Sequence, residues 1–559
     1  MIKISKLLFA ALLFGSSAFA QGNVKKNKSE SLPKNWYQLD AKTSGHTGIS
    51  LDKAYALIKS KNLSSTRIIV AVIDSGIDTL HEDLKPILWT NPKEIPGNGI
   101  DDDHNGYVDD VHGWNFIGGK DGRNVKEDSY EGARVYYALK TKWEGKQVDE
   151  TKLSAAEKKE YATYLESKRK TIGDTDPAQT EMLANMLDRL TAGDSVIRKE
   201  LGKEEYTSKD VETYSPVDFN AKAAKGILIS ISKANNSDAI TNTQLMDELK
   251  GEIRKGESAS KPPTDYRKDI VKDDETNIND RNYGNNDIMA GTPFHGTHCS
   301  GIIAAVRGND KGIEGIADNV RIMMVRAVPD GDEHDKDIAN AIRYAVNNGA
   351  RIISMSFGKD FSPQKQWVDD AFRYAESKGV LLVHAAGNDA KNIDTASNFP
   401  NPVYADGQGK ATNVITVGAS GDIKYGGLTA SFSNYGKKEV DVFAPGVDIY
   451  STIPGGTNYG NASGTSMAAP VVAGIAALIL EYYPNLTPQQ LKQAIQKSAQ
   501  MPAEKVNKPG TSNKVNLSDI SVSGGIVDAY EAVKYAGTLK IQQKKETLPK
   551  AKIKKSKMG

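Results

Sequence analysis

The sequence predicts an α/β protein whose mainly parallel sheet carries helices on both faces, a three-layer arrangement. One observation is a set of short runs rich in Ile and Val, namely RIIVAVIDSG (67–76), VRIMMVRAV (320–328), ARIISMSFG (350–358), GVLLVHAAGN (379–388) and ATNVITVGAS (411–420). Such runs are typical of strands that are buried on both faces. The other observation is that amphipathic helical patterns, as in 337–347 and 364–378, separate several of these runs. Strands that alternate with helices form parallel sheets, with the active site at the carboxyl ends of the strands.

The two ends of the chain differ from this pattern. Lys3 and Lys6 precede a short apolar stretch, and Ala18-Phe19-Ala20 offers small residues for cleavage. Residues 1–20 are therefore expected to be a signal peptide that directs the protein outside the cell or to the periplasm. Residues 538–559 are rich in lysine, and we expect a solvated basic tail.

Composition excludes some classes of partner. Lys plus Arg is 72 and Asp plus Glu is 71 among 559 residues, so charge gives no reason to expect a nucleic acid or an anionic membrane as partner. After the signal, the longest apolar run is 471–480, which is too short to cross a bilayer, and we expect a buried core helix and no transmembrane segment. The single cysteine, Cys299, excludes an intramolecular disulfide, and its small apolar neighbours favour buried packing.

A long segment interrupts the rhythm of strands and helices. Residues 121–285 are dense in Lys and Glu, with amphipathic stretches at Ser154–Lys170, Thr180–Leu190 and Thr243–Arg254. Ser154 and Glu157 fit a capping box. We therefore expect a mostly helical insertion. The remaining divisions are an N-terminal extension at 21–50 and a main α/β part at 51–120 and 286–537.

Three segments place a reactive side chain among small residues at the end of an apolar run or the start of a helix. They are Asp74-Ser75-Gly76, His295-Gly296-Thr297-His298 and Gly464-Thr465-Ser466. A serine hydroxyl becomes a good nucleophile when a neutral imidazole accepts its proton, and a carboxylate orients that imidazole. Asp74, His295 and Ser466 are thus candidates for a catalytic triad, and their order along the chain is Asp, His, Ser.

The sequence resembles the subtilase family in five blocks that occur in family order. These are IDSGID around Asp74, HGTHCSGIIAA around His295, SMSFG at 354–358, HAAGN ending at Asn388, and NASGTSMAAPVVAGIAALI around Ser466. The resemblance implies a subtilisin-like fold and a serine endopeptidase that works through an acyl-enzyme intermediate. It also implies that the Asn388 amide and the backbone N–H of Ser466 form the oxyanion hole, where fixed donors stabilise developing negative charge.

The same resemblance assigns the substrate-binding segments. It implies that Ser356, Phe357 and Gly358 form an edge that pairs with an extended substrate, and that Ala385, Ala386 and Gly387 form the opposite wall of the primary pocket. Main-chain pairing tolerates many side chains, so proteins and peptides are the expected substrates, while the oligomeric state stays open. His298 lies three residues after His295, but no further ligands accompany the pair, and the family block contains it as a structural residue.

A separate acidic segment predicts a structural calcium ion. Oxygen-bearing residues alternate around a glycine at the sixth position, as in an EF-hand loop. The expected ligands are Asp101, Asp103, Asn105 and Tyr107, with Asp109 or Asp110 closing the shell because His112 occupies the twelfth position. By resemblance, Asp83 and Asn309 align with a second calcium site. A solvated acidic turn without a metal is the alternative interpretation of the loop.

Two departures from the family pattern leave questions open. The insertion separates Asp74 from His295, so it must leave and re-enter near the active-site rim, as a lid, a substrate selector, an inhibitory segment or a passive surface domain. Little sequence precedes the first strand, so a propeptide is very short or activation is controlled elsewhere. The alternative function is a catalytically silent binding protein of the same fold, acting through the insertion and the tail.

Overall fold

The computed structural model describes residues 32–173, 176–235, 240–291 and 293–540. The expected signal peptide and most of the expected basic tail lie outside these ranges. At the centre is a seven-stranded sheet in the order β2-β3-β1-β4-β5-β6-β7, and every pairing in it is parallel. Its strands are β1 (Ile68–Asp74), β2 (Gly113–Asn115), β3 (Val320–Arg326), β4 (Ile352–Met355), β5 (Leu381–Ala385), β6 (Val414–Ser420) and β7 (Val442–Pro445). All five predicted strands are present, which confirms the α/β prediction.

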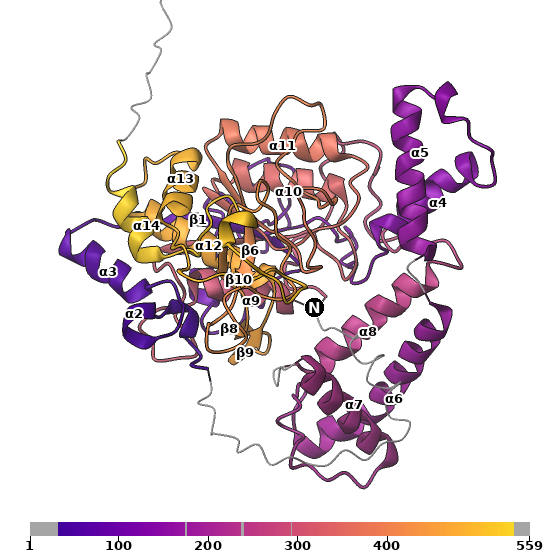
Figure 1. The fold of residues 1–559 in the computed structure, drawn as a ribbon, viewed down its shortest axis with the longest axis horizontal. Helices are drawn as coiled ribbons and strands as arrows, with labels where there is room; N and C mark the ends of the chain where they lie inside the picture. Colours follow the sequence, from indigo (N-terminus) through magenta and orange to yellow (C-terminus); the bar gives the residue numbers. More distant parts are fainter. Residues whose placement is uncertain (1–31, 174–175, 236–239, 292, 541–559) are drawn as a thin grey trace, which may run out of the picture.

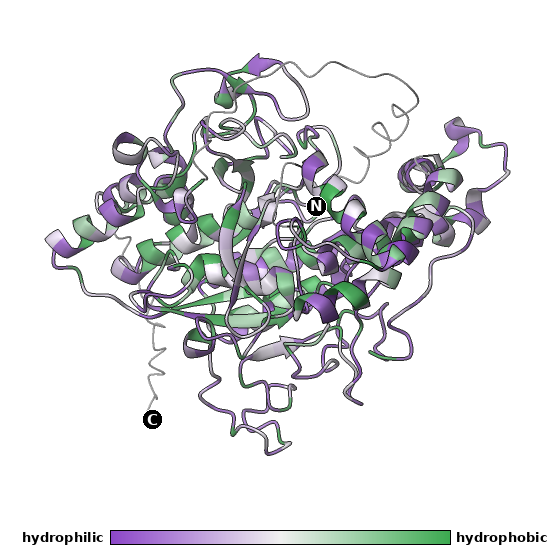
Figure 2. Ribbon diagram, turned by 90° about the horizontal axis from the view of Figure 1, so that it is seen from below, coloured by the Kyte–Doolittle hydropathy of each residue, from purple (hydrophilic) through white to green (hydrophobic). Residues whose placement is uncertain are grey.

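The alternation of side chains along each strand divides the core into two layers. Val70 and Val72 face one layer together with the helices α3, α9, α12, α13 and α14, whereas Ala71 and Ile73 face the other together with α10 and α11. The first group comprises α3 (Leu51–Ser60), α9 (Phe294–Ala304), α12 (Thr465–Tyr482), α13 (Pro488–Ser498) and α14 (Ala529–Ala536), and the second α10 (Asp335–Asn347) and α11 (Lys365–Ser377). Hydrophobic segments accordingly gather in the middle of the body (Figure 2). The predicted three-layer fold is thus confirmed.

Helix α12 occupies the centre of its layer. It contacts β1, β4, β5, β6 and β7 as well as α9. It is long and apolar enough to cross a membrane, but 89% of that span is buried inside the protein, as expected for a core helix. Its N-terminal end, where Ser466 lies, consequently sits at the carboxyl edge of the sheet.

The insertion contributes the helices α4 (Glu131–Trp143), α5 (Ala155–Lys168), α6 (Pro177–Leu201), α7 (Phe219–Asn235) and α8 (Asn242–Glu257). They lie together on one side of the α/β body (Figure 1). The helices α6, α7 and α8 have a hydrophobic core of their own, and at Gly193 the lack of a side chain lets α6 approach the backbone of α7 closely. The predicted helical character and the capping box of Ser154 with Glu157 are confirmed.

Two regions outside the predicted main body pack against it, namely residues 32–50 and the last part of the insertion around Arg267. Trp36 and Tyr37 are fully buried in the layer that contains α12, and the backbone N–H of Ala529 donates to Ile49 O at 2.7 Å. Residues 32–50, with the short helix α2 (Ala41–Ser44), are therefore built into the core. Likewise the Arg267 guanidinium pairs with Asp337 of α10 inside the protein. Outside the main sheet lie the antiparallel pairs β8 (Ile449–Ile453) with β9 (Asn458–Ala462) and β10 (Val506–Asn507) with β11 (Lys514–Val515).

Candidate active site

The fold brings the three candidate catalytic residues to one edge of the sheet. Asp74 is the last residue of β1, His295 is the second residue of α9, and Ser466 is the second residue of α12. Helices α9 and α12 pack against each other. Residues that are far apart in the sequence therefore meet where the strand ends and both helices begin, as the carboxyl-edge rule for parallel sheets predicts.

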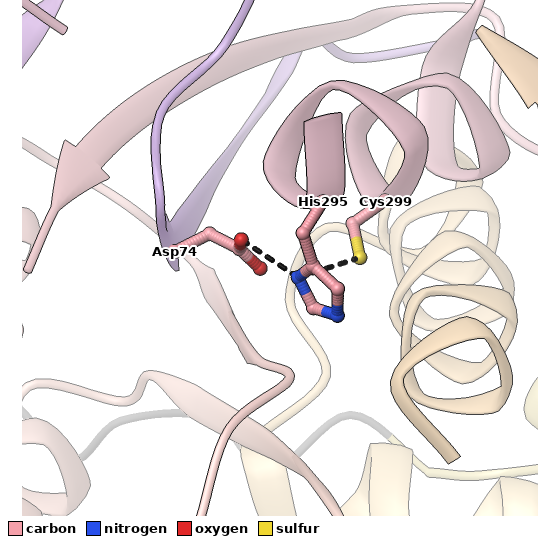
Figure 3. A group of neighbouring side chains, drawn as sticks. All are labelled: Asp74, His295 and Cys299. Carbon is pink, nitrogen blue, oxygen red and sulfur yellow. Dashed lines mark hydrogen bonds and ion pairs between the residues drawn. The ribbon is translucent and has the colours of Figure 1, made fainter. Parts of the chain in front are cut away.

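Asp74 and His295 form a hydrogen-bonded couple (Figure 3). The His295 Nδ1 atom lies 2.8 Å from Asp74 Oδ1, and the Asp74 side chain is 2% exposed whereas that of His295 is 38% exposed. Burial opposes a charge on the imidazole, but the Asp74 carboxylate outweighs this effect and holds the pKa of His295 well above its ordinary value. The carboxylate thereby favours the tautomer with the proton on Nδ1, which leaves Nε2 available to accept another.

Ser466 lies within the same group of elements. In this structure its hydroxyl donates to Ser356 O at 3.0 Å, and the Ser356 hydroxyl donates to Ser466 O at 3.0 Å. Catalytic hydrogen bonds between a serine and a histidine are often long before substrate binds. Rotation about the Ser466 Cα–Cβ bond redirects the hydroxyl, so this position does not argue against a role as nucleophile.

The Asn388 side chain is oriented by Thr465. Asn388 Oδ1 accepts hydrogen bonds from the backbone N–H of Thr465 at 2.9 Å and from its hydroxyl at 3.0 Å. Because the backbone N–H is a donor only, the amide oxygen must face Thr465 and the amide nitrogen faces away. A Cβ placed on Gly464 would lie 3.6 Å from Asn388 Nδ2 and 3.5 Å from Ser466 N. The two candidate oxyanion-hole donors thus flank the same glycine.

The two predicted substrate segments follow neighbouring strands. Ser356–Gly358 follows β4 and Ala385–Gly387 includes the end of β5. Ser356 and the alanines are buried, whereas Gly358 is exposed. The buried His384 ring contacts the segment Ser356–Gly358, since its Nε2 lies 2.9 Å from Phe357 O. The exposed backbone at Gly358 is consequently held in place by the core.

Two residues beside His295 have structural environments. Cys299 is fully buried, with its thiol 4.0 Å from His295 Nδ1 and 3.3 Å from Ser466 O, and burial raises the pKa of this thiol. His298 is also buried and its Nε2 lies 3.2 Å from Gly460 O, while burial lowers its pKa to about 4. A neutral His298 that contacts a backbone carbonyl matches the structural role that the sequence predicts.

The acidic loop gathers three carboxylates from two segments. Ligand oxygens of Glu94, Asp101 and Asp103 all lie within 4.8 Å of one another. Glu94 is 7% exposed, its Oε1 accepts from the backbone N–H of Asp103 at 3.1 Å, and its Oε2 is buried without a hydrogen-bond partner. Burial and the three neighbouring aspartates raise the pKa of Glu94. Three clustered carboxylates with an unpaired buried oxygen fit a calcium ion, which prefers oxygen ligands.

The other predicted loop ligands divide into two groups. Asn105 stays beside the carboxylates, since its backbone N–H donates to Asp101 and Asp103, and the side chain of Tyr107 is buried in the core, so only its carbonyl is available. Asp109 instead accepts from the backbone N–H groups of residues 97–99. Asp110 accepts from Tyr344 at 2.6 Å, and burial raises its pKa to about 6.

Closure of a calcium shell by Asp109 or Asp110 stays a prediction, and the structure adds one carboxylate to the loop, that of Glu94. This residue lies outside the loop motif, so the motif alone does not indicate it. Asp83 and Asn309, the second predicted pair, lie side by side, but both Asp83 oxygens already have partners: Asn309 Nδ2 at 2.6 Å and the Tyr459 hydroxyl at 2.7 Å. A calcium ion at this pair stays a prediction.

Comparison with known proteins identifies the family of this chain. A family model described as the subtilase family matches residues 65–518. The thermophilic serine proteinase of a Bacillus species (strain AK1) is 42% identical over 242 residues, 43% of this chain and 52% of that protein. Thermitase of Thermoactinomyces vulgaris is 38% identical over 244 residues, 43% of this chain and 75% of that protein. An extracellular protease of Xanthomonas campestris is 35% identical over 239 residues, 39% of each. The chain thus spans about half the length of the first of these relatives.

Proposed function

The chain belongs to the subtilase family, and from this premise we propose that it is a serine endopeptidase that hydrolyses peptide bonds in proteins. The observation that carries the proposal is the meeting of Asp74, His295 and Ser466 at the carboxyl edge of the sheet, with the 2.8 Å contact between the first two. The two relatives named as a serine proteinase and as an extracellular protease support the reaction class.

The proposed reaction uses each group for one step. The hydroxyl of Ser466 attacks the substrate carbonyl while Nε2 of His295 accepts its proton, and Asp74 stabilises the resulting imidazolium. The Asn388 amide and the Ser466 backbone N–H donate to the oxyanion of the tetrahedral intermediate. His295 then returns the proton to the leaving amine, which yields an acyl-enzyme. Water, deprotonated by His295, hydrolyses this ester and restores the serine.

A labelling experiment tests this proposal. A fluorophosphonate probe reacts with an activated serine, so it should label the wild type and not Ser466→Ala, and the wild type should cleave casein whereas the variant should not. Ser377→Ala is the control, because it removes an exposed serine hydroxyl at the end of α11, which donates to Tyr374 O at 2.7 Å, and it should still be labelled. Equal labelling of wild type and Ser466→Ala would contradict the assignment. A stable protein complex without casein cleavage would favour a silent binding protein.

We propose further that the acidic loop binds a structural calcium ion through Glu94, Asp101 and Asp103, with Asn105 and the carbonyl of Tyr107 as further oxygen donors. The support is the unpaired Oε2 of Glu94 and the mutual distances of the carboxylates. The ion would neutralise like charges that otherwise repel.

Export is also a proposal. The signal-like residues 1–20 and the extracellular name of one relative support a secreted or periplasmic location. Mass spectrometry of the mature N-terminus tests it, since cleavage after Ala20 is expected, and a chain that keeps residues 1–20 would contradict it.

A further inference from the structure

The two residues that follow the substrate edge join it to the insertion. Lys359 is only 6% exposed. Its Nζ donates to Glu131 Oε2 at 2.8 Å and to Glu333 O at 2.7 Å, and lies 3.0 Å from the carboxylate of Asp335. Glu131 is the first residue of α4, the helix with which the insertion begins. A buried ion pair therefore links the insertion to the residue next to Gly358.

Asp360 extends this link to the segment that follows Asn388. Its carboxylate accepts from Nζ of Lys170, which belongs to the insertion, and from Nζ of Lys391 at 2.6 Å. Lys391 lies three residues after Asn388 on the opposite wall. Asp360 is thus bonded to the insertion on one side and to the segment after the oxyanion residue on the other.

We call the contacts of Lys359 and Asp360 with Glu131 and Lys170 of the insertion the junction. Several further contacts stabilise it. The backbones of Lys359 and Phe399 exchange two hydrogen bonds, at 2.9 and 2.8 Å. The backbone N–H of Glu131 donates to Asp332 at 2.8 Å, and the Glu131 carboxylate also pairs with Arg134 at 2.7 Å. Buried charges are costly unless each is paired in good geometry. The Lys359–Glu131 pair therefore belongs to a buried network in which Asp335 also pairs with Lys359 and Arg134 also pairs with Glu131.

The main chain of the insertion makes a second connection. Its residues 126–129 run beside residues 330–332: the Asp330 N–H donates to Lys126 O at 2.8 Å, and the Asp128 N–H donates to Asp330 O at 2.8 Å. The side chain of Arg254, from α8, pairs with Asp330 at 2.8 Å. Residues 330–335 carry Glu333 and Asp335, the other two partners of Lys359. The insertion thus contacts Lys359 directly through Glu131 and also contacts the segment 330–335 that supplies its other side-chain and carbonyl partners.

We propose that the insertion is a part of the substrate-binding cleft and that Lys359 and Asp360 are positioning residues through which it strengthens the binding of extended substrates. This inference rests on the proposed function. Ser356 O contacts the Ser466 hydroxyl, so the substrate residue beside Ser356 is nearest the scissile bond. In this proposal the substrate pairs antiparallel to residues 356–358; since an extended chain advances about 3.3 Å per residue, its more N-terminal residues then reach Gly358 and the junction. Short substrates do not reach the junction.

Peptide length therefore separates this role from a general structural one. Glu131→Gln removes the charge that pairs with Lys359 and keeps the side-chain shape, and Lys170→Ala removes the more exposed link to Asp360. We expect either variant to lower kcat/KM for substrates with four residues N-terminal to the bond by roughly tenfold, chiefly through KM, as for loss of one charged hydrogen bond. In both variants, kcat/KM for a single-residue ester and the rate of fluorophosphonate labelling should equal those of the wild type. Lys170→Arg, which keeps the charge, should hydrolyse the tetrapeptide substrate at the wild-type rate.

The control is Lys250→Ala, which removes a similar ion pair with Asp247 inside the insertion and should leave both substrates unchanged. An equal loss on short and long substrates, or no loss on either, would overturn the inference. If Glu131→Gln does not fold, the result for Lys170→Ala alone tests the inference. This variant should fold, because the partly exposed ion pair of Lys170 with Asp360 is not required for packing. A wild type that is neither labelled nor able to hydrolyse any substrate overturns the proposed function, and this inference with it.

Discussion

A buried carboxyl in α12 should make the stability of the protein depend on pH. The Glu481 side chain is fully buried, and its Oε1 accepts from the backbone N–H of Asn319 at 3.2 Å. Burial, and next to it the carboxylate of Asp318, raise the pKa of Glu481 to about 9. The folded protein thus keeps this proton over a pH range in which the unfolded chain releases it.

The sign and size follow from that difference. Below pH 4.5, the ordinary value, both states are protonated and stability is complete. As the pH rises toward 9, the unfolded chain gains stability by releasing the proton, so the free energy of unfolding falls by about 1.4 kcal/mol per pH unit. At pH 7 the loss is about 3 kcal/mol relative to pH 4. A fully buried side chain needs no reduction of this figure for solvent screening.

Glu481→Gln removes the titration and keeps the acceptor for Asn319. In a Ser466→Ala background, where proteolysis cannot interfere, thermal and denaturant unfolding at pH 5, 7 and 9 should show a gain in stability over the parent that grows with pH. Glu504→Gln, at an exposed glutamate, is the control and should show no such trend. A difference between Glu481→Gln and its parent that is the same at all three pH values would refute the reasoning.

Three further predictions concern the proposed site and loop. Asn388→Ala should lower kcat by about 10²- to 10³-fold, a range measured on subtilisin, a member of the same family, and little change would remove Asn388 from the oxyanion hole. Asp74→Asn should lower kcat by about 10⁴-fold, the loss measured for the equivalent change in trypsin. It should also shift the acidic limb of kcat/KM to lower pH, because the carboxylate that raises the pKa of His295 is gone; an unmoved limb would contradict this. Chelation of calcium should lower the melting temperature of the wild type by several degrees, roughly the effect of losing a ligand present at a hundred times its Kd. Glu94→Gln should make this decrease smaller. A wild-type melting curve that chelation does not change would argue against the ion.

The strands and the grouping at the sheet edge were predictable because they depend on local patterns. Buried parallel strands appear as runs of Ile and Val, and Asp74 follows such a run directly. Helix α7 was not predicted: its sequence contains Gly226 and two serines, Ser230 and Ser232, which are weaker helix formers than alanine. It is stabilised by Ala221, Ala224, Leu228 and Ile231 in a core shared with α6 and α8. Tertiary packing, not local propensity, determines that element.

Sequence patterns did not predict the side chains that contact a site from outside its motif. Glu94 precedes the acidic loop, and its approach to Asp101 depends on how residues 91–99 fold around Asp109. The sequence shows that Thr465 is next to Ser466. Its hydrogen bond to the Asn388 side chain, however, joins the start of α12 to the loop after β5. Such pairs follow only from the three-dimensional arrangement, because nothing in the local sequence of one partner specifies the other.

The position of the insertion also limits what its role can be. Glu131 and Lys359 are separated by 228 residues, and both are almost completely buried. Breaking a buried ion pair at one partner costs several kcal/mol, and an insertion that swung away from the body would break the pair of Lys359 with Glu131, with Asp335 as the carboxylate that stays beside Lys359. A hinged lid at this junction would bear that cost in every open state. The contacts therefore favour an insertion that stays docked at the junction and affects the cleft by fixing its shape.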